Sequence, residues 1–142
     1  MFCGKNVNKE INRVHKRALR ILLNDYNASF DELLITNDEK TVHVQNLQKL
    51  LIEVYKSLNH ENPSFLWDLF SRKEVYYNLR IKDILTLPRA LTTSFGTNSI
   101  TFRGSILWNN TPDVIKSSNT VSVFGKNIKN WEGEGCNCKI CK

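Results

Sequence analysis

The sequence has no run of eighteen apolar residues, and its first ten residues, MFCGKNVNKE, lack the apolar segment of a secretory signal peptide. We therefore expect an intracellular protein, nuclear or cytoplasmic, that is not secreted and keeps its four cysteines reduced. No two aspartates are adjacent, and His43 and His60 have no Asp, Ser or Cys at a recognisable catalytic spacing. We therefore assign no chemistry to these histidines, and we expect no enzymatic activity from this chain alone.

The apolar content is sufficient for one modest core. The chain has 142 residues, of which 41% are hydrophobic and 10% aromatic, a size and composition typical of a single domain. We expect a mainly α fold, a small helical bundle of about five to six helices. One helical domain would cover residues 1–131, and residues 132–142 would form a flexible tail that contains cysteines.

The positive charge is concentrated in the first 24 residues. This segment has six Lys or Arg residues and a single acid, Glu10, so it carries five of the six net positive charges of the chain. Its apolar residues recur every three or four positions, which predicts an amphipathic helix. The residues expected on the buried stripe are Val7, Ile11, Val14, Ala18 and Leu22, with Ile21 beside them.

The basic residues of this helix fall on the side opposite to the apolar stripe. Such a face is either solvated or contacts the phosphates of a nucleic acid. Acids that would form i,i+4 pairs with it are almost absent, so both interpretations stay open, and His15 is expected at the boundary of the two stripes. The candidate nucleic-acid-binding residues are Lys9, Arg13, Lys16, Arg17 and Arg20.

Three further helix starts follow along the chain. Ser29 and Glu32 fit a capping box, which predicts a short helix through Ile35. Residues 37–39 are predicted to open a longer helix, with acidic residues in its first turn. The residues expected on the buried face of this helix are Leu47, Leu50, Leu51, Val54 and Leu58. A helix that starts at Pro63 is expected to bury Phe65, Leu66, Leu69 and Phe70.

The helical period is lost between residues 75 and 102. This stretch predicts extended chain, with a short antiparallel pair across a turn at Gly96. Arg80, Arg89 and Arg103 alternate with aromatic residues here. Such arginines either contact a nucleic-acid strand or pair with nearby acids and helix ends.

The last third of the chain contains more helix signals. Ser105–Trp108 is predicted to be a short helix, Thr111 and Pro112 begin another, and a last helix starts at Thr120 and ends at Trp131. Gly125 lies inside this last helix, at a cost of about 1 kcal/mol relative to alanine. We interpret Trp108, Phe124 and Trp131 as core anchors in preference to a platform for base stacking.

Three cysteines close the sequence, namely Cys136, Cys138 and Cys141. Cys138 and Cys141 form a C-x-x-C pair, which is a spacing that holds zinc. Three thiolates without a nearby histidine make an incomplete tetrahedral site, and Cys3 completes it only if the two ends of the chain meet. We therefore expect no cofactor, with a zinc site formed by the three cysteines as the open alternative.

Five segments in this order resemble one known family. They are NVNKEINRVHKRALRILLNDYNASFDELL, TVHVQNLQKLLIEVYKSLN, YYNLR, FRGSILWNNTPDVIKSS and a Phe-x3-Ile-x2-Trp spacing before C-x-C-x-x-C. Together they resemble the region after the polymerase domain in reverse transcriptases of LINE-type, non-LTR retrotransposons of the jockey-like kind, over essentially the whole chain. The resemblance implies that residues 1–24 lie in the thumb-like region just after the palm, and that Met1 is an interior methionine.

The resemblance also implies what this chain lacks. Reverse transcription needs paired aspartates that hold two metal ions, and neither these nor an endonuclease precede the matched segments. We therefore expect a fragment of a mobile-element RNA-directed DNA polymerase, with the RNA or DNA backbone and the upstream polymerase region as partners, and no membrane or small-molecule substrate. The alternatives are a structural subdomain that packs on the polymerase body without touching nucleic acid, and a degenerate remnant of the element.

Overall fold

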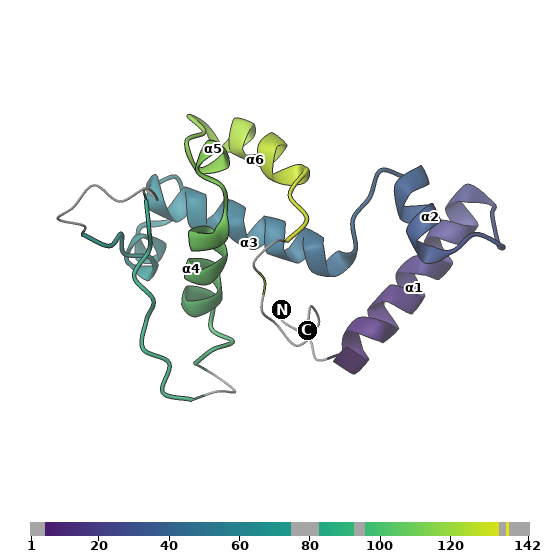
Figure 1. Cartoon of the computed structure of the whole chain (residues 1–142), viewed down its shortest axis with the longest axis horizontal. Coiled ribbons are helices and arrows are strands. Elements are labelled where there is room, and N and C mark those ends of the chain that lie inside the picture. Colours follow the sequence, from purple (N-terminus) through teal and green to yellow (C-terminus); the bar gives the residue numbers. More distant parts are fainter. Residues whose placement is uncertain (1–4, 75–82, 93–95, 134–135, 137–142) are drawn as a thin grey trace. The chain divides into compact units, whose positions relative to one another are not determined.

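The computed structural model describes residues 5–74, 83–92, 96–133 and 136. Within these ranges the protein is mainly α, as predicted, and none of the helices is long and apolar enough to cross a membrane (Figure 1). In chain order the helices are α1 (Lys5–Leu23), α2 (Phe30–Thr36), α3 (Val42–Leu58), the 3₁₀ helix η1 (Ser64–Leu69), α4 (Ile100–Asn110), α5 (Asp113–Lys116) and α6 (Val121–Lys129).

The described residues divide into two compact units. The first runs to residue 46 and the second begins at residue 47, so that α3 starts in the first unit and continues through the second. The expectation of one helical domain over residues 1–131 stays a prediction beside this division. Each unit is described by itself below.

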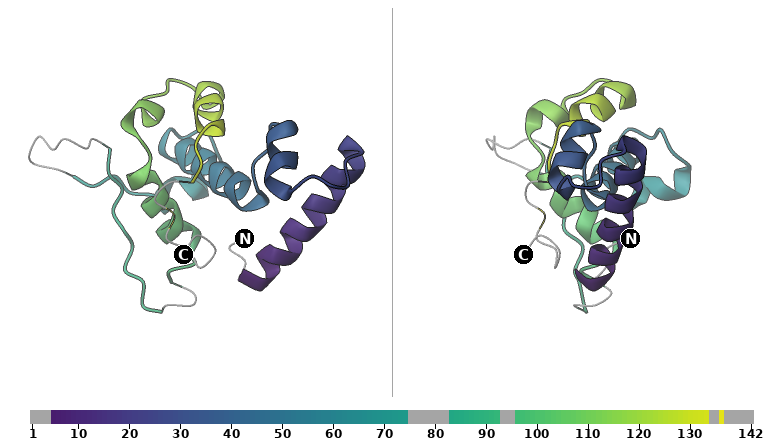
Figure 2. Two further views of the ribbon diagram at one scale, coloured as in Figure 1. Left: turned by 45° about the vertical axis from the view of Figure 1, so that its right-hand side comes forward. Right: turned by 90° about the vertical axis from the view of Figure 1, so that its right-hand side faces the viewer.

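In the first unit, α1 and α2 pack side by side through a small leucine core (Figure 2). Leu19 of α1 meets Leu33 and Leu34 of α2, and all three are buried. Leu23, Ala28 and Phe30 pack around them.

The predicted buried stripe of α1 is wrong. Val14 is 68% exposed and Leu22 is also 68% exposed, whereas Leu19 is 3% exposed. The packed side of α1 is therefore the neighbouring one, which contains Leu19 and Leu23 one turn apart. The chain returns along this side because Arg20 donates a hydrogen bond to the Ala28 carbonyl oxygen at 3.1 Å.

The beginning of α2 follows the sequence prediction. The Ser29 hydroxyl accepts the Glu32 N–H at 3.3 Å, and the Glu32 carboxylate accepts the Ser29 N–H at 2.7 Å, which completes the capping box. The bond from the Ser29 N–H is the main reason that the pKa of Glu32 lies below its ordinary value.

The first three helices end on residues in the left-handed region. Their φ angles are 52° at Asn24, 50° at Asp38 and 58° at His60, residue types that adopt this region more readily than most. After α2, the Glu39 N–H donates to the Leu34 carbonyl oxygen at 2.9 Å, which is the closing bond of a Schellman motif. A helix end of this kind needs no glycine.

The prediction that residues 37–39 open the third helix is therefore wrong. Asp38 terminates α2, and α3 begins only at Val42, with no acid in its first turn. The Thr41 hydroxyl caps this start by accepting the Val44 N–H at 3.4 Å. Asn and Asp favour both a helix start and a left-handed helix end, and here the second use prevails.

The second unit has an apolar core around α3. As predicted, one face of α3 is buried along its whole length through Leu47, Leu50, Leu51, Val54 and Leu58. Tyr55 stacks on Phe124 of α6 with ring centroids 4.4 Å apart, and Phe124 stacks on Trp108 of α4 at 6.0 Å. Trp108, Phe124 and Trp131 are 5% exposed or less, so their prediction as core anchors is confirmed.

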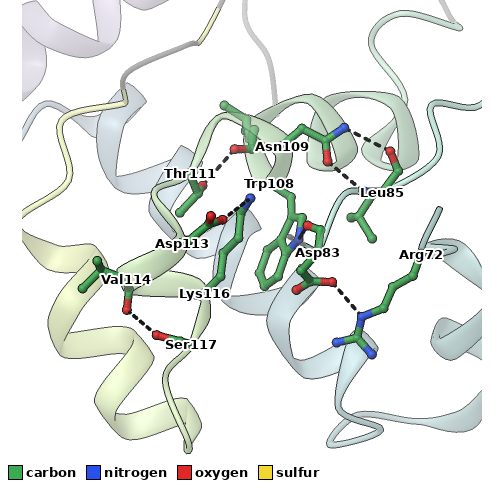
Figure 3. A network of polar contacts seen from close by, with 11 residues as sticks. Arg72, Asp83, Leu85, Trp108, Asn109, Thr111, Asp113, Val114, Lys116 and Ser117 are labelled. Carbon is green, nitrogen blue, oxygen red and sulfur yellow. Dashed lines mark hydrogen bonds and ion pairs between the residues drawn. The ribbon is translucent and has the colours of Figure 1, made fainter. Parts of the chain in front are cut away.

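The extended segment at residues 83–85 is held against α4 by side chains of α4 that form hydrogen bonds with the backbone of the segment (Figure 3). Asn109 accepts the Leu85 N–H at 2.7 Å and donates to the Leu85 carbonyl oxygen at 3.0 Å, while Trp108 donates to the Asp83 carbonyl oxygen at 3.1 Å. Arg72 pairs with the Asp83 carboxylate at 2.8 Å. Asn109 thus supplies the pairing that a neighbouring strand would give.

The antiparallel pair was predicted in the wrong place. Among the described residues, the only bridge joins Arg72 to Leu85, while the chain at Gly96 turns directly into α4. This helix begins at Ile100, earlier than the predicted Ser105, because the Ser99 hydroxyl accepts the Phe102 N–H at 3.2 Å.

The segment after Pro63 also differs from its prediction. It forms the short 3₁₀ helix η1, in which Phe65 is 76% exposed and Leu69 38% exposed, and only Phe70 of the predicted set is buried. The three-residue turn of a 3₁₀ helix cannot keep i and i+4 residues on one face.

Two helical glycines test the packing of the second unit. A Cβ at Gly104 would lie 2.7 Å from Cε1 of buried Phe70 and 3.0 Å from Cγ2 of Val54, whereas a Cβ at Gly125 meets nothing within 4 Å. We expect Gly104→Ala to lower the free energy of unfolding by about 1–3 kcal/mol and Gly125→Ala to raise it by about 0.5–1 kcal/mol. Urea unfolding measures both, and equal effects of the two variants would contradict the packing around Gly104.

Tyr55 makes the second unit sensitive to alkali. Burial raises the pKa of Tyr55 above its ordinary value of 10.0, and its hydroxyl donates to the Ser118 carbonyl oxygen at 2.6 Å. The contribution of the buried, protonated Tyr55 side chain to stability is complete below pH 10.0 and is lost as the pH rises through the raised pKa of Tyr55. We expect Tyr55→Phe to cost about 1 kcal/mol at neutral pH and to flatten the alkaline loss of stability, as measured by urea unfolding at increasing pH. Tyr26→Phe, at a residue that is 61% exposed, is the control and should leave this loss unchanged.

Candidate nucleic-acid interface

The five candidate residues lie along one arc of α1. Lys9, Arg13 and Arg17 are exposed, and the Arg13 side chain is 78% exposed. Arg13 pairs with Glu10 at 3.2 Å, a surface contact that contributes little to stability. Because α1 rises 1.5 Å per residue, the row from Lys9 to Arg20 is about 16 Å long, the length of about five nucleotides along one strand of a duplex.

Lys16 and Arg20 are less exposed than the other three cations. Both are half-buried. The charge of Lys16 helps to lower the pKa of Glu32 in α2, after the larger effects of its hydrogen bonds with Ser29. Arg20 holds the Ala28 carbonyl oxygen at the turn between α1 and α2. The arc therefore consists of three exposed cations and two half-buried ones, of which Arg20 also holds the turn before α2.

The interpretation of the aromatic residues as a base-stacking platform is excluded by their burial. Trp108 is 1% exposed and Phe124 is fully enclosed, so neither ring has a face open to a nucleotide. Arg103 donates to Asn98 at 3.1 Å, which is the local role that the sequence left open for it. Arg89 is exposed, and Arg80 lies outside the described residues.

The predicted zinc ligands are described only in part. Cys136 is half-buried, and its N–H donates to the Gly133 carbonyl oxygen at 3.2 Å. Cys3, Cys138 and Cys141 lie outside the described residues. In the described ranges no group of three or more His, Cys, Asp or Glu residues is placed to hold a metal ion. The zinc site thus stays a prediction.

One contact within the first unit was not predicted from the sequence. His15 Nε2 lies 3.0 Å from a carboxylate oxygen of Glu39, and the His15 ring meets Phe30 edge-on with centroids 5.5 Å apart. The signal was the spacing of His15, Leu19 and Leu23, four residues apart, which marks the packed side of α1.

An open hollow beside α1 was also not predicted from the sequence. The hollow has a volume of about 410 Å³, and Val42 of α3 faces α1 across it. The remaining lining residues come from α1 and are Val7, Glu10, Ile11, Val14 and His15. It lies on the apolar side of α1, away from the basic arc.

A scan against protein-family models, a search of the curated proteins and a search of the solved structures each find no match to this chain. The family suggested by the sequence motifs therefore stays a prediction.

Single substitutions separate the structural cations from the exposed ones. We expect Arg20→Gln to lower the free energy of unfolding of the first unit by about 1 kcal/mol, because it removes a charged donor from the Ala28 carbonyl oxygen. Arg13→Gln should change it by less than about 0.5 kcal/mol, because Arg13 pairs with the exposed Glu10 at the surface. Urea unfolding followed by helical circular dichroism measures both, and equal costs would contradict this division.

Proposed function

We propose that this chain is the post-palm, thumb-like and tail region of a non-LTR retrotransposon reverse transcriptase, and that it contacts the backbone of RNA or DNA through α1. The observation that carries the nucleic-acid contact is the concentration of five of the six net positive charges on residues 1–24. The exposed positions of Lys9, Arg13 and Arg17 support it, because a phosphate can approach them without unfolding α2. The family assignment rests on the order of the five sequence segments.

In this proposal the chain has an accessory role. The basic arc holds the template or primer by charge, without reading its sequence. The chemistry of polymerisation belongs to the palm, and the chain itself supplies no catalytic group. The second unit, with its aromatic core, acts as the structural support that follows the thumb.

A salt series tests the contact. We expect single-stranded RNA and duplex DNA to bind with an affinity that falls steeply with salt, because each neutralised phosphate contributes roughly 0.7–0.9 to the slope of log K against log salt. The variant Lys9→Gln, Arg13→Gln, Lys16→Gln, Arg17→Gln should flatten this slope by about 3 in filter binding. Arg20 is left in place so that the turn after α1 is kept, and glutamine preserves helix propensity.

A charge-matched variant completes this experiment. It replaces Lys49, Lys73, Lys126 and Lys129, which are exposed and lie in the second unit, by glutamine. The net charge falls by the same amount, so a non-specific charge effect would lower affinity equally in both variants. Binding that is indifferent to the α1 variant would refute the proposed contact.

A second function is favoured by the apolar residues that α1 leaves exposed. They fit an interaction subdomain that binds protein and leaves nucleic acid alone. Failure to shift any RNA or DNA, together with capture by the upstream polymerase region, would favour this alternative. The genomic sequence directly upstream of Met1 tests the family assignment itself, since a reading frame for a polymerase palm is expected there.

A further inference from the structure

The apolar residues of α1 that lie outside its packed side have the spacing of a coiled-coil seam. Five of them follow each other at intervals of four, three, four and three residues, which places them at alternating d and a positions of a heptad. They are Val7, Ile11, Val14, Ala18 and Ile21, called the α1 seam below. Val7 is 53% exposed, Val14 68% and Ile21 63%, Ala18 is exposed and Ile11 is half-buried, so most of the seam is open to solvent.

The hollow of about 410 Å³ lies along the seam and leaves room for side chains of a second helix. Val42 of α3 forms one wall, while Val7, Ile11 and Val14 of the seam form the other. A helix that is laid along the seam would insert its own a and d side chains here, as knobs enter holes. The packed leucines of α1 lie outside this contact and would keep α2 in place.

We propose that the occupant of the seam is a second copy of α1, laid antiparallel to the first. In this register Ile11 faces the partner's Val14, and Val7 faces the partner's Ala18. The twofold axis repeats both layers, so a self-complementary interface of four layers results. Each layer pairs a larger with a similar or smaller aliphatic side chain, which a close helix pair accommodates.

The charges beside the seam select this orientation. Glu10 and Arg17 occupy the two g positions, which flank the seam on the same side. Antiparallel helices bring g next to g, so Glu10 meets the partner's Arg17 and Arg17 meets the partner's Glu10. A parallel pair would instead place Glu10 beside the partner's His15 and Arg17 beside the partner's Leu22. Only the antiparallel register therefore places two pairs of opposite charges beside the seam.

The remaining basic residues do not oppose this association. Lys9, Arg13, Lys16 and Arg20 occupy c and f positions, on the side of α1 that faces away from the seam. Their charges therefore lie on the outer surfaces of the pair, where salt screens them over about 10 Å. The contact is small by the standards of stable interfaces, and we expect a dissociation constant on the order of 100 µM.

Sedimentation equilibrium of the full chain tests the proposal, with a reductant present so that cysteines cannot link the copies. We expect a reversible monomer–dimer equilibrium that Val14→Glu weakens more than about tenfold, because a charge would be buried in the central layers. Val114→Glu, at an 81% exposed valine of α5, is the matched control and should leave the equilibrium unchanged. A wild-type chain that stays monomeric up to millimolar concentration would overturn the proposal and leave the seam to another protein.

A charge-swap cycle tests the orientation. Glu10→Arg and Arg17→Glu should each weaken the dimer, since each places like charges side by side. The double variant should restore it, because the pair is exchanged in both copies and the net charge is unchanged. Weakening that persists in the double variant overturns the antiparallel register. Circular dichroism of each variant shows whether α1 is still helical.

The result is independent of the nucleic-acid proposal. Sedimentation is performed without RNA or DNA, and Val14 lies off the basic arc. Filter binding at protein concentrations far below the dissociation constant observes monomers alone. The neutral variant Val14→Asn should also weaken the dimer but leave that affinity unchanged, because it adds no charge to α1, so the two proposals fail separately.

Discussion

The contact of Leu19 with Leu33 and Leu34 is the interaction on which the first unit depends. These are the buried leucines that join α1 to α2, and α2 has only seven residues with which to cover a helix of nineteen. A unit that runs only to residue 46 buries little surface, since even a domain of about 60 residues buries only about 60% of the surface that its unfolded chain exposes. The short α2 therefore leaves most of the circumference of α1 to other tasks.

That constraint divides α1 into three sides. One side, with His15, Leu19 and Leu23, packs within the unit; the next carries the cations; the third carries the apolar seam. The half-buried Lys16 and Arg20 lie where the packed side meets the basic one, which explains why Arg20 can also donate a hydrogen bond to the Ala28 carbonyl oxygen. A helix with one partner would need only two sides. The third side is the physical basis for proposing a second contact.

The sequence predicted the second unit better than the first for a physical reason. On α3, the leucines at 47, 50, 51 and 58 have several neighbours to pack against, so the apolar face is also the buried face. On α1, amphipathicity identified the apolar residues but could not show which of them a neighbouring helix covers. Leu19 is buried, whereas Val14 is exposed. Asp38 misled for a different reason, since an aspartate suits both ends of a helix and only the backbone angle decides.

The cations of the candidate site could be found from the distribution of charged residues along the sequence, because counting charges does not require knowledge of any tertiary contact. The hydrogen bond of Arg20 to Ala28 and the pair of His15 with Glu39 depend on how the loops return, which periodicity does not describe.

The opposite placement of seam and cations has a consequence for binding. In the proposed antiparallel pair, Lys9, Arg13, Lys16 and Arg20 of each copy lie on the outer side, so a short strand would reach only one set of cations at a time. Dimerisation then adds little affinity for a short oligonucleotide, because the second arc is not within reach of the same strand. Two strands, or one strand that folds back, gain the benefit of both arcs, since the second contact becomes intramolecular. Taken together, the two proposals would thus lead the chain to hold two nucleic-acid segments together, and would add little to its affinity for a single one.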